Sequence, residues 1–505
     1  MIFLAFFTLV LFFVEGFLLY TYNTLLTPYV IDSIMQSNFK ESKEFLETFL
    51  GVRIVLVVLC LFAATFLYFK FFDFSFSFRF HNAFLGFFVL VSVIFFADMA
   101  VRYHKGKDAF EKFKQFSLTR AIYSVAEFYG NHNFFYDYKK LVTNYQSIRN
   151  SYEGAINVSA DSPTHIVLVL GESTQRNFMS LYGFSLPTTP YLDSLQNSGN
   201  LVAFSDTIAN FAQTKLALQN LLNFSNAGDE TWYHYLDIVN LFSLAGYKTA
   251  IFSNQEIVGS EVQAISSISA YADYKSSANR LLTSSRIAES QIGYDGILLP
   301  WMKEFYAQNK ESKTFNIVHL MGTHNTYSKR YPREFAKFSK EDLSYANSLN
   351  SSQKDIVATY LNALLYNDFI LNAIYEIYKN EDAIIFYVSD HGESLYQHQG
   401  KLGHFSTTRF NAEIPLVALM SESFKQKHPK TLKSLQSSKD KPFMLDDLIH
   451  TLTNIAQIEV KDYDSTKDIL SDDFNTQRVR MFNLKADYDK DLKQEKDSSL
   501  KERSK

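Results

Sequence analysis

The sequence predicts an α/β protein in which N-terminal transmembrane helices precede a domain with a mostly parallel central sheet. Two observations support this class. Three long apolar runs lie before residue 102, and from about residue 163 short apolar runs alternate with helical stretches of about ten to twenty residues. A chain of 505 residues is long enough for two or three domains.

The three apolar runs span roughly Ile2–Tyr20, Leu50–Phe72 and Ala83–Val101, and each is long enough to cross a bilayer. The alternative, core helices of a soluble protein, fits poorly with their length and lack of charge. The first run has no basic n-region and no cleavage site, so we expect an anchor and not a cleaved signal peptide. Glu15 lies within this run, where an acid marks a functional site by default; the alternative is a position near the outer interface, paired or snorkelling.

Loop charges predict the orientation. Lys70, Arg79 and His81 lie between the second and third runs with one acid, Asp73, which places the 73–82 loop in the cytoplasm. Everything after the third run then lies outside. In a Gram-negative bacterial cell we therefore expect a multi-pass protein of the inner membrane, with the region after the third run in the periplasm.

Composition excludes little else. The net charge of −4 gives no argument for nucleic acid as a partner. The one cysteine, Cys60, cannot form a disulfide within the chain.

We expect four regions: a membrane domain, amphipathic bridging helices, a catalytic domain and a charged tail, at residues 1–103, 104–160, 161–480 and 481–505. In the bridge, basic residues interleave with Phe110, Phe113 and Phe116, which suits either a helix on the membrane face or an ordinary solvated helix. The tail is rich in Lys, Asp and Glu from about residue 484, and we expect it to be disordered or a frayed helix.

Five apolar runs of the catalytic region are predicted to be buried strands, and the intervening stretches, such as Ile356–Tyr378, to be helices on both faces of the sheet. The predicted strands are Ile166–Leu170, Lys248–Phe252, Phe315–Leu320, Ile384–Val388 and Leu416–Met420.

Acidic and imidazole side chains follow two of these strands. Glu172 comes directly after the strand 166–170, and Asp390 and His391 come after the strand 384–388. Ligands bind at the carboxyl ends of strands in open α/β sheets, and carboxylates with an imidazole form a metal-binding set. The pattern predicts a metal-dependent hydrolase or transferase.

Thr214 is the candidate nucleophile because it precedes an apolar helical pattern and so lies near a helix N-terminus, which favours anions and phosphate. Coordination to Zn²⁺ would activate its hydroxyl. On spacing alone, a helix cap is the more common role for such a threonine. Thr207 and Ser205 are the next candidates.

Four further histidines follow strand ends: His319, His324, His398 and His404. Of these, His324 and His404 could bind phosphoryl oxygens, protonate a leaving group or hold a second metal.

Several motifs occur in one order along the chain: Gly171-Glu172-Ser173-Thr174, Leu181-Tyr182-Gly183-Phe184, Thr188-Thr189-Pro190, Gly322-Thr323-His324, Lys329-Arg330-Tyr331-Pro332, Ser389-Asp390-His391-Gly392-Glu393-Ser394 and Glu413-Ile414-Pro415. Together, over most of residues 20–460, they resemble the phosphoethanolamine transferases, which are integral membrane enzymes of the alkaline phosphatase/sulfatase superfamily. The resemblance implies a sulfatase-like α/β/α domain and transfer of phosphoethanolamine from phosphatidylethanolamine to lipid A or another surface acceptor.

The resemblance also implies roles for individual residues. Glu172, Thr214, Asp390 and His391 would bind the catalytic zinc, and Thr214 would carry a phosphoethanolamine-threonine intermediate. Contacts with the substrate are expected from His324, His404, Glu41 and Asn254; the two histidines would bind the phosphate or an accessory zinc. Glu41 belongs to the loop 33–44, which resembles the family's periplasmic loop between membrane helices.

The chain also departs from the family pattern. Three membrane helices are predicted where the family typically has five, as if the first two were missing. Lys215, Leu216 and Ala217 replace the usual small residues and proline after the nucleophile, and a disulfide within the chain is not possible. The Cys-x-Pro-x-Arg segment of sulfatases does not occur, which argues against hydrolysis of sulfate esters.

Two alternatives use the same residues differently. A glycerol-phosphate transferase or phosphodiesterase of the superfamily would share the metal and the nucleophile, and donor assays separate it from the favoured activity. A catalytically inactive membrane sensor or scaffold would keep the fold alone. The intact set of Glu172, Thr214, Asp390 and His391 argues against this second alternative.

Overall fold

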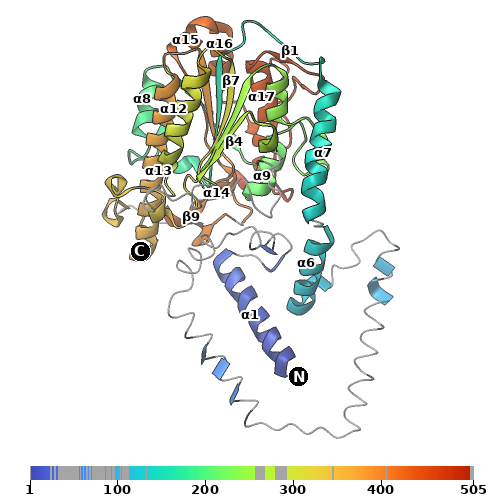
Figure 1. Ribbon diagram of the computed structural model, residues 1–505. Helices are drawn as coiled ribbons and strands as arrows, with labels where there is room; N and C mark the ends of the chain where they lie inside the picture. The colour runs from blue at the N-terminus through green and yellow to red at the C-terminus, as the bar shows by residue number, and fades with distance from the viewer. Residues whose placement is uncertain are drawn as a thin grey trace. The chain divides into compact units, whose positions relative to one another are not determined.

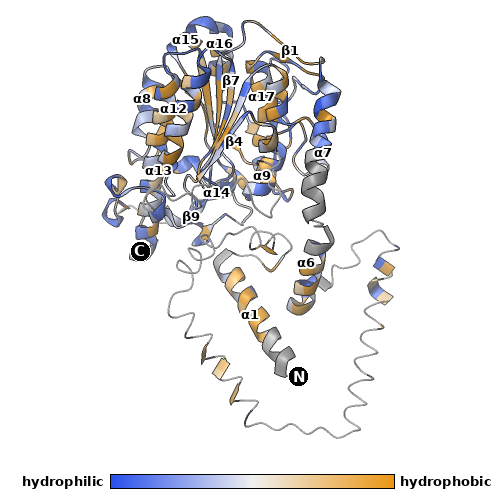
Figure 2. Ribbon diagram, viewed as in Figure 1, coloured by the Kyte–Doolittle hydropathy of each residue, from blue (hydrophilic) through white to orange (hydrophobic). Residues whose placement is uncertain are grey.

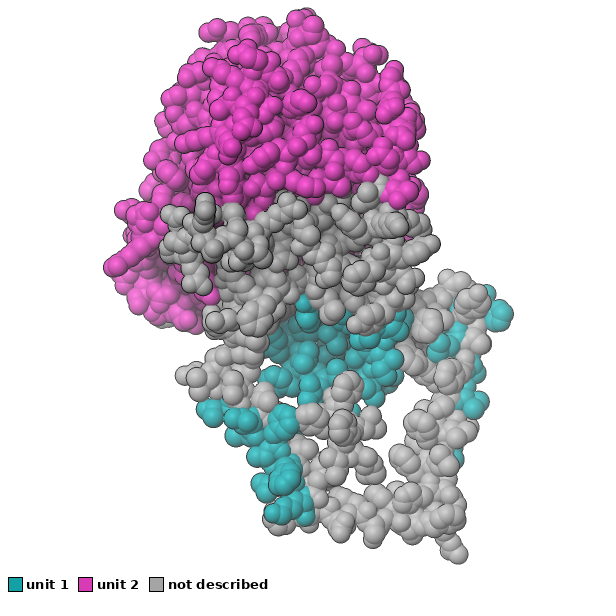
Figure 3. Space-filling view, viewed as in Figure 1, with its two compact units in different colours: residues 1–133 teal, residues 134–505 magenta. Residues whose placement is uncertain are grey.

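The computed structural model describes residues 2–22, scattered positions between 25 and 104, and residues 113–131, 134–255, 265, 268–278, 293–343, 346–404 and 406–500. The chain divides into two units, residues 1–133 and 134–505, which Figure 3 colours separately.

The first unit contains helix α1 (Ile2–Tyr22), the short turn η1 (Phe113–Gln115) and helix α6 (Ser117–Asn131). A buried ion pair joins the two helices: Arg120 of α6 donates from Nε to Oε1 and from Nη2 to Oε2 of Glu15 in α1, each over 2.7 Å. The Ser124 hydroxyl adds a hydrogen bond to the Leu26 carbonyl, 3.1 Å away. Glu15 is therefore paired, and its position relative to a membrane interface stays a prediction.

The middle of α1 is strongly apolar in Figure 2. No helix within the described residues meets both the length and the hydropathy needed to cross a bilayer. Most of the predicted runs Leu50–Phe72 and Ala83–Val101 lies outside the described residues.

The second unit is built around a sheet of seven described strands in the order β3 (Leu201–Ala203), β11 (Leu416–Met420), β8 (Ala383–Ser389), β2 (His165–Gly171), β7 (Thr314–His319), β5 (Lys248–Ser253) and β6 (Tyr274–Ser277). The five predicted strands are confirmed within one or two residues. From β8 to β6 the strands run parallel, whereas β11 runs antiparallel to both of its neighbours. The sheet is therefore mixed, because β11 begins beside the end of β8, where Leu416 pairs with Val388.

Helices cover both faces of this sheet (Figure 1). Helices α8 (Pro190–Asn197), α12 (Leu298–Asn309) and α13 (Ser351–Tyr378) lie on one side, and α9 (Thr214–Leu221) and α17 (Leu448–Ile455) lie on the other. Strand residues face apolar layers on both sides, which explains why every residue of β2 and of β8 is buried. Helix α13 begins at a capping box in which Asn350 and Gln353 bond reciprocally to each other's backbone.

The remaining described elements are short or peripheral. The helices are α7 (Phe134–Tyr152), α10 (Ile238–Leu244), α14 (Arg409–Ala412), α15 (Glu422–Lys427) and α16 (Pro429–Ser438). The strand pairs are β1 (Asn157–Val158) with β13 (Ile458–Glu459), β4 (Thr207–Ile208) with β12 (Phe443–Met444), β9 (Ser394–His398) with β10 (Lys401–Gly403), and β14 (Met481–Phe482) with β15 (Ala486–Asp487).

The charged C-terminal segment is structured, and the expectation of a disordered or frayed tail from residue 484 was wrong for the residues up to 500. Strands β14 and β15 lead into the helical turn η12 (Tyr488–Leu492). Arg480, just before β14, is buried and donates to Asp206 and to Asp489 over 2.6–2.9 Å. Asp206 lies 274 residues from Arg480 in the sequence, so local composition does not indicate this ion pair.

Candidate active site

The parallel register brings the predicted acidic residues to one edge of the sheet. Gly171, the last residue of β2, pairs with Ser389, the last residue of β8. Glu172 and Asp390 therefore follow at the same level, and His391 comes next. All three side chains are buried, and one ligand atom of each lies within 4.8 Å of the others.

Three atoms of this triad lie close together: Glu172 Oε1, Asp390 Oδ2 and His391 Nε2. Asp390 accepts backbone N–H bonds from Ser173 (3.1 Å) and His391 (2.8 Å) at Oδ1, while its buried Oδ2 accepts none from the described residues. His391 donates from Nδ1 to the Gly392 carbonyl over 3.0 Å, so Nε2 is the ring nitrogen that can bind a metal. That Nε2 lies 3.4 Å from Asp390 Oδ2 and 3.4 Å from Glu172 Oε1.

This donor set fits a divalent metal. A buried carboxylate oxygen without a hydrogen bond is costly unless a cation compensates its charge. Two carboxylates and an imidazole whose other nitrogen is fixed by a backbone carbonyl form the pattern of a catalytic zinc site.

Thr214 joins the same cluster. It is the first residue of α9, and its hydroxyl donates to Glu172 Oε2 over 3.1 Å and lies 3.5 Å from His391 Nε2. The cap position belongs to Gln213, so Thr214 is not the helix cap. Ser205 instead bonds to Asp440, and Thr207 lies buried in β4.

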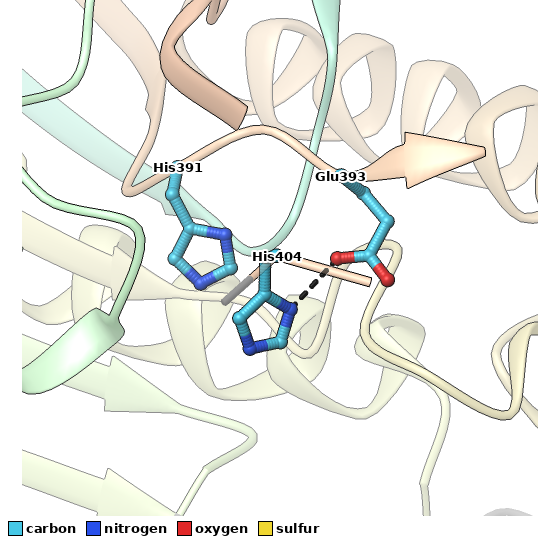
Figure 4. Close-up of side chains that lie close together, drawn as sticks. All are labelled: His391, Glu393 and His404. Atoms are coloured by element: carbon cyan, nitrogen blue, oxygen red, sulfur yellow. Dashed lines mark hydrogen bonds and ion pairs between the residues drawn. The ribbon is translucent and has the colours of Figure 1, made fainter. Parts of the chain in front are cut away.

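His404 lies beside the triad and is oriented by Glu393 (Figure 4). Its Nδ1 is 2.7 Å from Glu393 Oε2, and its ring centre is 4.3 Å from that of His391. Burial has the largest single effect and would lower the pKa of His404, but the carboxylates of Glu393, Glu172 and Asp390 together raise that pKa above its ordinary value. The Tyr327 hydroxyl donates to the other oxygen of Glu393 over 2.8 Å. His391, Glu393 and His404 also form a second group that could hold a metal.

His324 has the opposite electrostatic character. Burial lowers the pKa of its imidazole to about 4, so the ring is neutral at pH 7. Its Nδ1 is buried and has no hydrogen-bond partner among the described residues. Of the other two histidines, His319 Nδ1 lies 3.4 Å from the Ser253 hydroxyl, and His398 pairs with Glu495 in the C-terminal segment.

Two of the expected substrate contacts are not seen at this cluster. Glu41 lies outside the described residues. Asn254 is buried, and its amide donates to Asp295 Oδ1 over 2.8 Å, so it supports the loop that carries His324. A direct contact of Asn254 with substrate stays a prediction.

The roles of three residues at the site were not predicted from the sequence. Gln255 donates to Glu172 Oε2 over 3.2 Å, and Ser173 donates to Glu172 Oε1 over 2.8 Å. Both follow strand ends, so the signal that found Glu172 could have found them. Asp295 is buried and accepts the backbone N–H groups of Met321 (2.7 Å) and Gly322 (2.9 Å). No local pattern announces this last role.

Comparison with known proteins agrees with the geometry. The family model described as Sulfatase matches residues 164–458, which is more than half of the chain. The chain belongs to the sulfatase family. The mixed sheet between two helical layers is the α/β domain of that family.

The named relatives confirm the resemblance to the phosphoethanolamine transferases. The phosphoethanolamine transferase EptC of Escherichia coli K12 is 31% identical over 325 residues, which are 63% of this chain and 55% of that protein. The Kdo(2)-lipid A phosphoethanolamine 7''-transferase of Salmonella typhimurium is 27% identical over 270 residues, 52% of this chain and 45% of that protein. The chain thus spans about half the length of the curated relatives that it matches. These relatives are enzymes of the sulfatase superfamily.

A solved structure matches the second unit. The C-terminal periplasmic domain of E. coli EptC, crystallised as a complex with Zn, is 28% identical and superposes with a TM-score of 0.61. The match covers 68% of this chain and 98% of that domain.

Gly322 gives a test of the loop that supports Glu172. Its φ is +51°, and a Cβ there would lie 2.9 Å from the backbone N of Glu172 and 3.0 Å from its backbone O. Gly322→Ala should therefore lower the free energy of unfolding by more than the about 1–2 kcal/mol of left-handed strain alone, because the backbone of Glu172 must move.

Gly154→Ala is the matched control, since Gly154 also has a positive φ of +72° but no atom within 4 Å of the added Cβ. Urea unfolding of both variants measures the difference. Equal losses would show that the Gly322 loop does not constrain Glu172.

Proposed function

We propose that this chain is a zinc-dependent phosphoethanolamine transferase, which takes the group from phosphatidylethanolamine and passes it to lipid A or another surface acceptor. One observation carries the proposal. The hydroxyl of Thr214 lies 3.1 Å from Glu172 Oε2 and 3.5 Å from His391 Nε2. That nitrogen lies 3.4 Å from Asp390 Oδ2, which accepts no hydrogen bond from the described residues. A nucleophile and a metal-binding set thus share one site in a chain related to phosphoethanolamine transferases.

Glu172, Asp390, His391 and Thr214 would hold the zinc. When bound, the metal would lower the pKa of the Thr214 hydroxyl and stabilise the charge that develops on the phosphoryl oxygens. The EptC domain crystallised with Zn has the same fold at 28% identity, which supports zinc as the metal.

The chain's own residues would then perform two transfers. In the first, the Thr214 oxygen attacks phosphorus, its proton passes to Glu172, and the bond from phosphorus to the diacylglycerol oxygen breaks. In the second, an oxygen of the acceptor attacks the phosphorus of the phosphoethanolamine-threonine, the bond from phosphorus to the Thr214 oxygen breaks, and Glu172 returns its proton to that oxygen.

His404 suits the role of proton donor to the departing diacylglycerol oxygen. Its raised pKa keeps more of the ring protonated at neutral pH, and Glu393 fixes its Nδ1 so that Nε2 points away from Glu393 (Figure 4). His324, whose ring is neutral, would instead contribute a hydrogen bond to the phosphate.

The first transfer needs no acceptor, and this gives the test of the proposal. Wild-type protein incubated with phosphatidylethanolamine alone should carry phosphoethanolamine on Thr214, as peptide mass spectrometry would reveal. Thr214→Ala should carry no adduct and transfer nothing, yet keep most of its zinc through the other three ligands. Asp390→Ala is the control that should lose most of its zinc.

Other outcomes would point elsewhere. A glycerol-phosphate adduct that forms only with phosphatidylglycerol would show that phosphatidylglycerol is the donor. Release of the free headgroup without any adduct would indicate a phosphodiesterase. If Thr214→Ala transfers phosphoethanolamine at the wild-type rate, Thr214 is not the nucleophile.

We further propose that residues 1–103 form the membrane domain, that 104–160 bridge it to a periplasmic catalytic domain at 161–480, and that 481–505 form the C-terminal segment of that domain. The apolar N-terminal runs and the loop charges support this arrangement, as does the periplasmic origin of the EptC domain. Donor and lipid acceptor both reside in the bilayer, so anchoring raises their effective concentration at the enzyme.

Reporter fusions test this orientation. Alkaline phosphatase fused after residue 505 should be active in cells, because the proposed topology places the C-terminus outside the cytoplasm. Green fluorescent protein fused at the same position should not fluoresce, because it would be exported by the general secretion route. The same two reporters fused within the 73–82 loop should give the reverse pattern. A fluorescent C-terminal fusion would contradict the proposed topology.

A further inference from the structure

The C-terminal segment reaches two loops of the active site. One is the turn 210–213 that leads into Thr214, and the other is the stretch 406–408 that follows His404. The connection is made by Asn483, the first residue after β14.

Asn483 makes three hydrogen bonds. Its backbone N–H donates to the Asn210 carbonyl over 2.9 Å, and its side-chain Oδ1 accepts the backbone N–H of Ala212 over 2.8 Å. Its Nδ2 donates to the Thr407 hydroxyl over 3.1 Å. The amide thus holds the backbone two residues before Thr214 and links it to the loop three residues after His404.

The backbone of Asn483 suits this task. Its φ is +55°, a left-handed conformation that asparagine tolerates better than most residues. The anchors of the segment lie on either side. Phe482 is fully buried, Arg480 pairs with Asp206 and Asp489, and the Tyr488 hydroxyl donates to Glu413 over 2.8 Å. These contacts hold the segment without the Asn483 side chain, whose amide bonds instead to the two active-site loops, at Ala212 and Thr407.

We propose that Asn483 is a positioning residue for the transfer reaction, which fixes the turn before Thr214 so that its hydroxyl points at Glu172 and His391. The inference rests on the proposed role of Thr214 as the nucleophile. Asn483 touches neither Thr214 nor, in any described contact, the metal-binding set, so it acts through Ala212 and Thr407.

Asn483→Gly is the decisive variant, because glycine adopts the positive φ without strain and removes only the side-chain contacts. The first transfer to Thr214, followed in a single turnover, should slow by about 10- to 100-fold, since small displacements of a nucleophile have effects of this size. The KM for phosphatidylethanolamine, the zinc content and the melting temperature should stay close to those of the wild type.

Asn483→Asp should retain most of the wild-type rate of the first transfer, because a carboxylate oxygen still accepts the hydrogen bond from the Ala212 N–H. Asn475→Ala is the matched control from the same segment. Asn475 is exposed, and its side chain accepts a bond from the nearby Gln477 backbone alone among the described contacts. It should leave the rate unchanged.

A second readout does not depend on the donor. Hydrogen exchange of the peptide that contains Ala212 should be faster in Asn483→Gly than in the wild type, and unchanged in Asn475→Ala. If wild-type protein transfers nothing from phosphatidylethanolamine, the proposed function fails, while this exchange measurement still tests whether Asn483 holds the turn.

Two results would overturn the inference. One is a wild-type transfer rate in Asn483→Gly. The other is an equal loss of rate in the Gly and Asp variants together with a lower melting temperature in both, which would make Asn483 a residue of general stability.

Discussion

Two buried carboxylates face one imidazole at the carboxyl edge of the sheet, and the arrangement of the site depends on the charge that they create. Glu172 and Asp390 lie close enough to repel each other, and Asp390 Oδ2 has no hydrogen-bond donor among the described residues. Such a pair is stable when a cation shares its charge. The backbone N–H bonds to Asp390 Oδ1 and the carbonyl bond to His391 Nδ1 hold the remaining atoms ready for that cation.

Around this centre lie two histidines whose pKa values are shifted in opposite directions. Burial keeps His324 neutral at pH 7, whereas Glu393 raises the pKa of His404. Tyr327 supports Glu393 from behind and stays protonated itself, since burial raises the pKa of its hydroxyl well above the ordinary value. One imidazole is therefore suited to accept or donate a neutral hydrogen bond, and the other to deliver a proton.

The strands and the residues that follow them could be predicted from the sequence, because an apolar run that ends in an acid or a histidine is a local signal. This is how Glu172, Asp390 and His391 were found, and the structure brings them together. Thr214 was predicted near a helix N-terminus, and it is the first residue of α9.

Residues that act across the fold left no such signal. Asp295 meets Gly322 only after the chain has passed through α12 and β7, and Asn483 meets Ala212 across 271 residues. The charged composition after residue 484 predicted disorder. That prediction failed because the ion pairs of Arg480 with Asp206 and Asp489, which hold the segment, form only in the folded protein. Asn254 was expected at the substrate from the family resemblance alone, yet its side chain donates to Asp295, and its neighbour Gln255 donates to Glu172.

Anomalous X-ray diffraction at the zinc absorption edge, from crystals of the zinc-loaded protein, tests the central claim most directly. We expect a strong anomalous peak bounded by Glu172, Asp390 Oδ2, His391 Nε2 and the Thr214 hydroxyl. A site without such a peak in zinc-loaded crystals, or a peak whose neighbours do not include Thr214, would contradict it.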